Sequence, residues 1–407
     1  MSDETGSTEA PTRREYVKYG GAVVGGGLLA GCAGDSAPET TPAETSETTT
    51  TERKTTTTSE TDSSYEVTVE PYGPVAFDEV PKTYVTMGSG AWTDIGFAFG
   101  NEPIAMSMSY YPFQYYRSLP DVSFDENAVT DLGEVSAMST EQLFEIDADV
   151  HIVDKQLVAS YSGWDGDGFD QIENNVGPFA GSYIRGEWSG NALGMEFSFP
   201  YYTLPEAITL VGNVFKQRER ASVWTRQLES FTADIADRLP ESTPDVGIIY
   251  SGSDPSKGTF FIASPTAAGV GNFPYGVLDV TNGFADLTDA ETYQTDYEGL
   301  LEMDPDYICV DSAISQLSPQ EFESKFIDTM SDDPVGRELS AVKNDAVVRG
   351  CGRHQGPIIA HFETEAMAKQ LHPDEFGAFD PERFPEVLKD ERLFDRQRLA
   401  DIINGEF

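Results

Sequence analysis

Short hydrophobic runs alternate with longer amphipathic stretches along most of the chain. Runs rich in β-branched and aromatic residues begin at residues 83 (TYVTM), 104 (IAMSM), 150 (VHIV), 246 (VGIIY), 307 (YICV) and 346 (AVVR). Strands separated by helical stretches are typical of parallel α/β sheets, in which ligands bind beyond the carboxyl ends of the strands. The pattern therefore predicts an α/β fold with mainly parallel sheets.

One amphipathic stretch near the middle of the chain is longer than the others. Between residues 214 and 239 the apolar residues recur at spacings of three or four, and they are Ala221, Trp224, Leu228, Phe231, Ile235 and Leu239. Pro240 ends the run. A helix of this length would extend about 40 Å. Its central place favours a connector between two lobes, although an ordinary helix inside one domain fits the same pattern.

One phrase occurs twice, once on each side of this helix. Residues 140–154 read TEQLFEIDADVHIVD and residues 297–311 read YEGLLEMDPDYICVD. In each copy we expect a short helix with one buried side, a turn at Asp-Ala-Asp or Asp-Pro-Asp, and then a strand. Glu141 and Glu298 lie in the first turn of each helix, where packing does not require a carboxylate. Interaction with the helix dipole, worth about 0.3–1 kcal/mol, is the structural explanation for these glutamates.

Length and charge limit the classes of function. A chain of 407 residues suggests roughly two to three domains. Its 70 acidic and 26 basic residues give a net charge of −44, which repels nucleic acid and anionic membrane surfaces. We therefore exclude nucleic-acid binding. The acidic residues are spread over a chain with 39% hydrophobic residues, a pattern typical of folded proteins from concentrated brine, where salt screens carboxylate repulsion.

The first 32 residues predict an export signal. Arg13 and Arg14 precede an apolar run of twelve residues that ends at Gly31, and Cys32 follows. A run of this length is too short to cross a hydrocarbon core, which takes about 20 residues. The segment TRREYVK resembles a twin-arginine export motif, and LAGC resembles a lipobox. We expect Cys32 to carry a lipid, and the protein to be anchored on the extracellular face of the cytoplasmic membrane.

The remaining sequence divides into a tether and a folded body. Residues 33–64 consist mostly of Thr, Ser, Glu, Pro and Ala, and they predict a disordered, solvated tether. We expect an N-terminal lobe at 65–213, a connecting helix at 214–240, and a C-terminal lobe with a C-terminal extension at 241–407. The extension, from Gly377 onward, should form an amphipathic helix that packs on the second lobe.

Thiols and imidazoles are few in the folded body. Cys309 and Cys351 are expected to be buried free thiols, with a disulfide as the alternative. Of the four histidines, only His354 lies in a loop that we expect at the ligand cleft. Because a transition-metal carrier needs clustered imidazoles, we expect no bare metal ion and no cofactor.

The order of these features resembles the substrate-binding proteins of ABC importers that carry cobalamin, haem or ferric siderophores. The resemblance extends from Tyr65 to about Phe376. It rests on EPYGPVAFDEVPKTYVTMGSGAWTDIGFAFG, on both copies of the repeated phrase, on GVLDVTNGFADL and on LHPDEFG. It implies two Rossmann-like lobes joined by a single long helix. It also implies that Glu141 and Glu298 dock onto arginines of a membrane permease. The first copy departs from the family in having Ala148 where proline is usual, which would loosen that turn.

Loops that follow the strands of both lobes are expected to line a ligand cleft. The aromatic and cationic candidates in these loops are Trp92, Tyr110, Tyr111, Trp164, Tyr183, Arg185, Trp188, Lys257 and Arg353. Aromatic rings with a polar edge suit a large ligand, and the cations suit an anionic ferric chelate. Each aromatic residue could instead pack in the core, and each cation could be a solvated loop charge.

These features together predict a solute-binding protein and not an enzyme. We expect a monomer that captures a ferric siderophore, with iron arriving only inside the chelate, and delivers it to an ABC permease. Cobalamin or haem is the alternative cargo, and a tethered ligand-sensing module is the alternative role. An enzyme is disfavoured because the chain has no Gly-x-Ser-x-Gly, no His-Glu-x-x-His and no Gly-x-Gly-x-x-Gly that opens a helix after a strand.

Overall fold

The computed structural model describes residues 64–87, 90–109, 111–186, 193, 202–284 and 293–407. The predicted export and lipidation residues Arg13, Arg14 and Cys32 lie outside the described residues, as does nearly all of the predicted tether. Within the described ranges, no helix is both long enough and apolar enough to cross a membrane.

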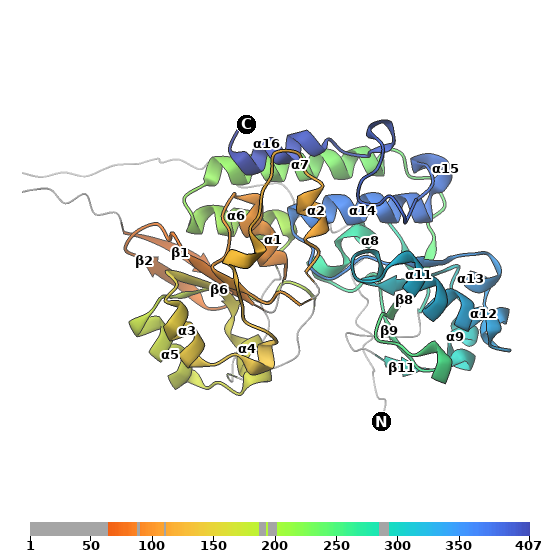
Figure 1. Ribbon diagram of the computed structural model, residues 1–407, viewed down its shortest axis with the longest axis horizontal. Coiled ribbons are helices and arrows are strands. Elements are labelled where there is room, and N and C mark those ends of the chain that lie inside the picture. Colours follow the sequence, from red (N-terminus) through yellow and green to blue (C-terminus); the bar gives the residue numbers. More distant parts are fainter. Residues whose placement is uncertain (1–63, 88–89, 110, 187–192, 194–201, 285–292) are drawn as a thin grey trace, which may run out of the picture. The chain divides into compact units, whose positions relative to one another are not determined.

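The first lobe contains a five-stranded sheet in which every neighbouring pair is parallel (Figure 1). Its strands, in spatial order, are β5 (Thr130–Asp131), β4 (Ala105–Met106), β3 (Tyr84–Met87), β6 (Val150–Asp154) and β7 (Phe179–Gly181). The residues of β3 and β6 are buried throughout, because helices cover both faces of a parallel sheet. A separate antiparallel ribbon precedes the sheet and consists of β1 (Tyr65–Val69) and β2 (Gly73–Phe77).

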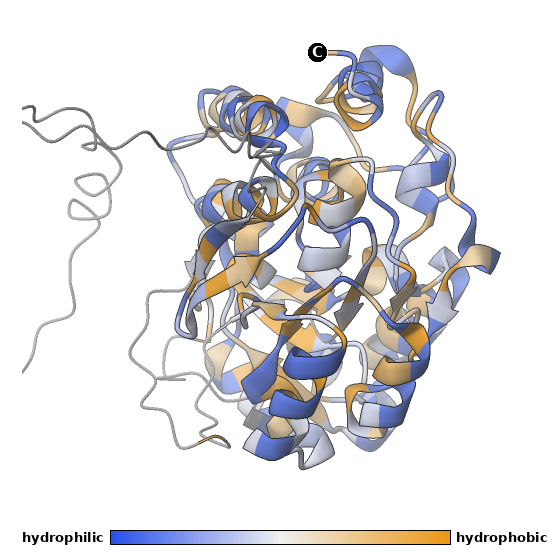
Figure 2. Cartoon of the chain, turned by 90° about the vertical axis from the view of Figure 1, so that its left-hand side faces the viewer, coloured by the Kyte–Doolittle hydropathy of each residue, from blue (hydrophilic) through white to orange (hydrophobic). Residues whose placement is uncertain are grey.

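The helices of the first lobe follow its strands. They are α1 (Gly90–Ala98), α2 (Gln114–Arg117), α3 (Thr140–Ile146), α4 (Lys155–Ser162), α5 (Gly166–Asn175) and α6 (Leu204–Val214). Short 3₁₀ turns occur at Glu126–Ala128 and Val135–Ala137. In Figure 2 the helices nearest the viewer carry hydrophilic residues on their outer faces, while the strands behind them are mainly hydrophobic. This division is the one expected for amphipathic helices that pack on a buried sheet.

The second lobe contains a mixed sheet. Its strands are β11 (Tyr293–Thr295), β9 (Phe260–Ala263), β8 (Asp245–Tyr250), β12 (Tyr307–Asp311) and β13 (Val347–Arg349), with β10 (Thr281–Asn282) also paired to β8. The pairs that β8 makes with β10 and β12 are parallel, as is β12 with β13, whereas β9 is antiparallel to both of its neighbours. The chain therefore has two α/β lobes with mainly parallel sheets, as predicted.

Short helices surround the second sheet. They are α8 (Phe273–Val277), α9 (Tyr297–Met303), α10 (Ala313–Gln316), α11 (Pro319–Phe322), α12 (Thr329–Asp332) and α13 (Ser340–Lys343). A π-helical segment at Glu323–Asp328 joins α11 to α12, and 3₁₀ turns occur at Pro255–Lys257, Val270–Asn272 and Gly336–Glu338. Cys309 and Cys351 are both buried and unpaired.

The connecting helix α7 (Arg218–Ala236) is shorter than the sequence predicted. A short non-helical turn separates α6 from α7, and Lys216 in this turn adopts a positive φ of 54°. The first residues of the predicted helix therefore lie in α6 and in this turn. The predicted apolar stripe is present in α7, because Trp224, Leu228 and Phe231 are all buried. At 1.5 Å per residue the helix extends about 28 Å.

Helices α14 and α16 pack against α7, and both lie beside it in Figure 1. Helix α14 (Pro357–Leu371) is buried along nearly its whole length and also contacts α1, α2 and α8. It is followed by α15 (Pro373–Phe376), a 3₁₀ turn at Lys389–Glu391 and α16 (Arg396–Asn404).

The C-terminal extension contacts more of the molecule than we predicted. Helix α16 contacts α1 of the first lobe and the connecting helix α7. Its first residue, Arg396, also forms a buried ion pair with Glu365 of α14 in the second lobe. The Asn404 side-chain amide donates to the Asp121 carbonyl in the first lobe, at 3.1 Å. The apolar residues Leu399 and Ile402 are fully buried. Amphipathicity indicated that this helix would pack, but it carries no information about the further contacts with α1 and α7.

Candidate ligand cavity between the two lobes

A cavity of about 520 Å³ lies where the carboxyl ends of strands from both lobes meet. Its volume is in the range of small-molecule sites. The lining residues are Met87, Gly90, Thr93, Ser107, Ser109, Tyr111, Glu134, Val135, Ser136, Leu157, Tyr161, Tyr183, Arg185, Ser251, Asp311, Ser312, Gln316, Arg353 and His354.

Strand ends explain why these residues come together. Met87 ends β3, Ser107 follows β4, and Tyr183 follows β7 in the first lobe. Ser251 follows β8 and Asp311 ends β12 in the second lobe. Because the carboxyl ends of parallel strands share one edge of a sheet, each lobe presents its loops to the same space.

Arg353 follows β13 and is held by Asp311. The guanidinium Nε lies 3.2 Å from Asp311 Oδ1, and the side chains are 12% and 9% exposed. The Arg353 guanidinium also lies 5.0 Å from the centre of the Tyr250 ring. Burial is the largest influence and lowers the pKa of Arg353, but Asp311, helped by Tyr250 and other nearby ionisable groups, raises the pKa above its ordinary value. Arg353 is thus a fixed cation, and among the described residues its buried Nη2 has no hydrogen-bond partner.

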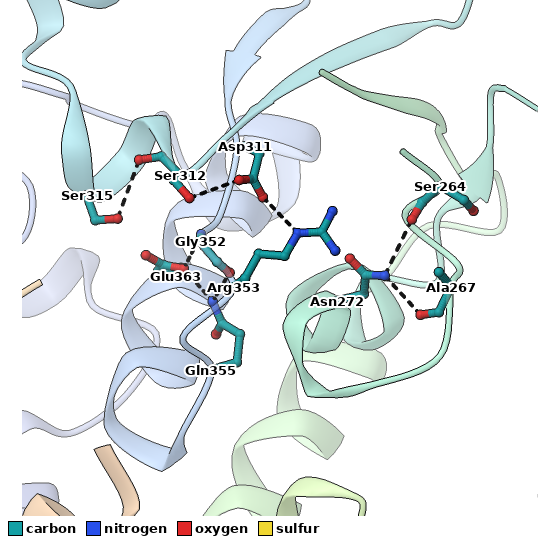
Figure 3. A network of polar contacts seen from close by, with 10 residues as sticks. All are labelled: Ser264, Ala267, Asn272, Asp311, Ser312, Ser315, Gly352, Arg353, Gln355 and Glu363. Atoms are coloured by element: carbon teal, nitrogen blue, oxygen red, sulfur yellow. Dashed lines mark hydrogen bonds and ion pairs between the residues drawn. The ribbon is translucent and has the colours of Figure 1, made fainter. Parts of the chain in front are cut away.

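The loop that carries Arg353 is fixed by Glu363 on α14 (Figure 3). Glu363 Oε2 accepts from the Gly352 amide at 2.7 Å and from the Gln355 side chain. Its Oε1 accepts from the Tyr115 hydroxyl of the first lobe at 3.0 Å. Burial raises the pKa of Glu363 to about 7. One buried carboxylate therefore links the Arg353 loop to the first lobe.

A second buried carboxylate joins the lobes behind the cavity. Asp94 on α1 accepts from the amides of Ile358 and Ile359, at 2.9 and 3.1 Å, where α14 begins. It also accepts from Tyr116, whose hydroxyl lies 2.6 Å from the hydroxyl of Tyr111. Burial raises the pKa of Asp94 to about 7. A carboxylate at a helix N-terminus is a favourable arrangement, because free amides there point toward negative charge.

His354 is a neutral acceptor in the wall of the cavity. Its Nδ1 accepts from the Gly90 amide of the first lobe at 3.1 Å. Burial lowers the pKa of His354 to about 4, and the nearby Arg185 adds to this effect. Within the described ranges, no group of three or more histidine, cysteine or acidic side chains could hold a metal ion.

The cavity lining holds two cations, Arg185 and Arg353, and two acidic residues, Glu134 and Asp311. Arg353 is paired with Asp311, whereas Arg185 has no ion-pair partner in the part of the chain that the structure describes. Burial raises the pKa of Tyr183, and both Arg185 and Arg353 oppose that shift, so both guanidinium groups act on one tyrosine. Hydroxyl groups of serine, threonine and tyrosine supply much of the remaining polar surface. Such a lining can hold an anionic, oxygen-rich ligand through charge-assisted hydrogen bonds.

Four of the predicted ligand contacts line this cavity: Tyr111, Tyr183, Arg185 and Arg353. Tyr110 and Trp188 lie outside the described residues. The other three lie elsewhere. Trp92 is fully buried in the core and donates its indole N–H to the Ser182 carbonyl at 2.8 Å. Trp164 donates to the Met138 carbonyl and packs on Phe169, away from the cavity lining. Lys257 is exposed and pairs with Asp254.

The two tryptophans share a physical reason. We expected their loops to lie near the cleft, but the ring of a tryptophan can turn away from it if its N–H finds an acceptor elsewhere. Lys257 instead pairs with Asp254 at the surface. Conversely, the prediction missed Tyr161, Asp311 and several hydroxyl residues of the lining. Asp311 had a signal, because it is the final residue of the second repeated phrase and follows a buried strand.

Glu141 and Glu298 lie as the repeat predicts, exposed in the first turns of α3 and α9. Helix α3 has a capping box of Ser139 and Gln142, and Asp296 caps α9 by accepting from the Gly299 amide. Hydrogen bonds from its own amide and from Ser139 lower the pKa of Glu141 below its ordinary value. Both glutamates are therefore placed by a well-formed helix end and remain open to a partner.

Comparison with known proteins places the fold. Residues 189–351 match the model of the periplasmic binding protein family. No protein with curated information matches the sequence. A periplasmic binding protein from Veillonella parvula has a TM-score of 0.54 and 15% identity, and the match covers 76% of this chain and 98% of that one.

Two further solved structures are similar to the chain. The iron uptake ABC transporter substrate-binding protein PiuA from Streptococcus pneumoniae has a TM-score of 0.52 and 15% identity, with 75% of this chain and 98% of PiuA covered. Staphylococcus aureus SirA, solved with staphyloferrin B, has a TM-score of 0.52 and 13% identity, with the same coverage of 75% and 98%. The chain therefore has the α/β fold of the two-lobed periplasmic binding proteins.

Proposed function

We propose that the chain is an extracellular, lipid-anchored solute-binding protein that captures a ferric siderophore, or a similar iron chelate, between its lobes and delivers it to an ABC permease. The observation that carries this proposal is the cavity at the strand ends of both lobes, with Arg185 and Arg353 in its walls. The match to the periplasmic binding protein model and the fold shared with PiuA and SirA support it.

The lining of the cavity favours an anionic chelate as cargo. Arginine recognises carboxylate and catecholate oxygens with charge-assisted hydrogen bonds, and hydroxyl groups add further donors. Iron would arrive as part of the chelate, so it is cargo and not a cofactor. Cobalamin or haem is the second candidate cargo. A tethered ligand-sensing module would use the same cavity without a permease.

The experiment that tests the cargo is calorimetric titration of the full chain in molar KCl. Ferric hydroxamate, ferric catecholate and ferric carboxylate siderophores are titrated, with cobalamin and haem in parallel. We expect saturable binding of one ferric chelate class. Calorimetry is preferable to tryptophan fluorescence, because Trp92 and Trp224 are fully buried and Trp164 does not line the cavity. Saturable binding of cobalamin or haem alone would overturn the siderophore assignment.

A pair of charge-removing substitutions tests the site within that experiment. Arg185→Ala should weaken binding by about tenfold or more, which corresponds to about 1.4 kcal/mol. Lys257→Ala is the matched control, since it removes one positive charge that is exposed and outside the cavity. Equal losses of affinity in the two variants would indicate a general electrostatic effect and would contradict a specific site.

Delivery is tested separately from capture. Glu141→Ala and Glu298→Ala should lower permease-dependent uptake of the bound chelate while leaving its affinity unchanged. Glu145→Ala is a control on the same helix as Glu141. Exposed ion pairs contribute only about 0–1 kcal/mol each, so we expect the double variant to show the clear loss. Normal uptake by the double variant would argue against docking and for a sensing role.

A further inference from the structure

Main-chain hydrogen bonds join the two lobes at the edge of the cavity. The Val270 amide donates to the Ile184 carbonyl at 2.8 Å, and the Gly271 amide donates to the Arg185 carbonyl at 2.9 Å. Residues 184–186 follow β7 of the first lobe, and residues 269–271 precede α8 of the second. We call these two segments and their hydrogen bonds the clip. They connect backbone with backbone, so they do not depend on the identity of most side chains.

The clip requires glycine on its second-lobe side. Gly269 has a φ of 111°, and a Cβ there would lie 2.4 Å from Gly186 Cα. A Cβ on Gly271 would lie 2.6 Å from the Arg185 carbonyl oxygen. These neighbours are backbone atoms, which cannot turn away as a flexible side chain could. Only glycine therefore permits this approach without displacing the chain.

Gly271 also lies between the two arginines of the cavity. A Cβ at this position would be 3.4 Å from Arg185 Cγ and 3.4 Å from Arg353 Cδ. The aliphatic parts of an arginine from each lobe thus flank one glycine. The clip therefore holds two arginines, whose charges repel each other, against the same glycine.

Hydrogen bonds from Asn272 support the second-lobe side of the clip (Figure 3). The Asn272 side-chain amide donates to the carbonyls of Ala267 and Ser264, at 2.9 and 3.4 Å, and so closes the loop that contains Gly269. In the same region Arg353 is fixed by Asp311. The second-lobe segment that receives residues 184–186 is therefore held by contacts within its own lobe.

We propose that the second lobe positions Arg185 of the first lobe through the clip. Arg185 and Arg353 then converge on one anionic group of the ligand. Gly269 and Gly271 are the positioning residues. The main-chain carbonyl of Arg185 belongs to the clip, whereas its side chain lines the cavity. Closing the lobes and completing the anion site are then a single event. The anionic ligand rests on the proposed function; the clip does not.

The clip is tested by hydrogen exchange on the full chain without ligand. In the wild type the amides of Val270 and Gly271 should exchange slowly, although they lie outside regular strands. Gly271→Ala and Gly269→Ala should speed exchange of these amides by tenfold or more. Gly276→Ala in α8 is the control, because a Cβ there meets no heavy atom within 4 Å. Unprotected amides in the wild type, or unchanged protection in both clip variants, would overturn the clip.

The positioning of Arg185 is tested by the titration of His354, followed by NMR. Arg185 contributes to the low pKa of His354, so displacing it should raise that pKa. We expect the rise in Gly271→Ala and in Arg185→Ala, and none in Gly276→Ala; a His354→Gln variant assigns the resonance. An unchanged His354 pKa in Gly271→Ala, beside a changed one in Arg185→Ala, would show that the clip does not position this arginine.

The convergence on one anion is tested with a ferric tris-catecholate. Gly271→Ala and Arg185→Ala should each weaken binding by tenfold or more. The losses in the double variant should be less than additive, because both changes remove the contact made by Arg185. Additive losses would contradict the proposal. If the wild type binds neither this probe nor the other ferric chelates, the proposed function and the anionic ligand are both contradicted. The hydrogen-exchange experiment and the His354 titration need no ligand, so they test the clip independently.

Discussion

The two copies of the repeated phrase form the same helix, turn and strand, but their final aspartates make different contacts. In both, an N-capped helix ends at an aspartate in the left-handed region, with φ of 52° at Asp147 and 40° at Asp304. A buried strand follows and ends in a second aspartate. The left-handed conformation is shared although the next residue is Ala148 in one copy and Pro305 in the other.

The aspartates that end the two strands differ in what they bind. Asp154 caps α4 by accepting from the Leu157 amide at 2.6 Å, and it accepts from the Tyr72 hydroxyl at 2.9 Å. Asp311 instead pairs with Arg353 in the cavity wall. Duplication thus supplies a structural unit with an acid at the carboxyl end of a strand, and the neighbouring loops decide whether that acid caps a helix or holds a cation.

The largest expected loss of stability at neutral pH follows from this pair of acids. Asp311→Ala should lower the free energy of unfolding by about 3 kcal/mol, because it leaves a largely buried guanidinium unpaired. Asp154→Ala should cost about 1–2 kcal/mol through the loss of a helix cap. Urea unfolding of both variants in molar KCl measures the difference. A larger loss for Asp154→Ala would show that the cap, and not the ion pair, is the more important contact.

A second difference is pH-dependent. His151 occupies the first strand where Ile308 stands in the second, and it is fully buried with a pKa lowered by burial to about 4. Because the folded pKa lies below the unfolded value, the contribution of neutral His151 to stability is complete above pH 6.5 and is lost as pH falls toward 4. The loss approaches about 3 kcal/mol. His151→Ile should remove it.

The measurement is the free energy of unfolding of the wild type and of His151→Ile between pH 4 and 7.5. The difference between the two proteins should grow as the pH falls. Asp94 and Glu363 act in the opposite sense, because their pKa values are raised to about 7 and their protonation favours the folded state. Comparing the two proteins cancels these contributions. A constant difference across this range would mean that His151 does not titrate as its burial implies.

The smallest expected effect concerns the turn. Pro305→Ala should lower the free energy of unfolding by about 0.4–1 kcal/mol, mainly because the unfolded chain gains conformational freedom. The first copy reaches the same left-handed turn without proline, so the folded geometry should survive. Thermal unfolding detects the change. A loss of several kcal/mol would indicate that Pro305 contributes packing that Ala148 does not need.

Hydrophobic patterning predicted the central strands and the repeat, and it missed β1, β2, β5, β7, β9, β10 and β11. All six predicted strands are present, because buried parallel strands produce dense apolar runs that stand out in a sequence. The start of the connecting helix was wrong because the break at Lys216 has no proline or glycine to mark it. The contacts of α16 with α1 and α7 were not predicted, because packing between distant segments is not encoded in local periodicity.

The site was predicted at the level of loops more than of individual side chains. Loops after strands were correctly brought to the cavity, since topology alone determines where strand ends lie. The direction of a side chain depends on its hydrogen-bond partners, so Trp92 turned into the core toward Ser182 while Tyr183 and Arg185 line the cavity. The clip left no signal beyond the glycines at 269 and 271, whose requirement appears only when both lobes are in place.

The position of α16 has a consequence for biosynthesis. Its buried face covers α1, an element of the first lobe, although the two helices are far apart in the sequence. Contacts between segments so distant in sequence slow folding. The first lobe therefore completes its core only once α16 has been synthesised, long after its own strands.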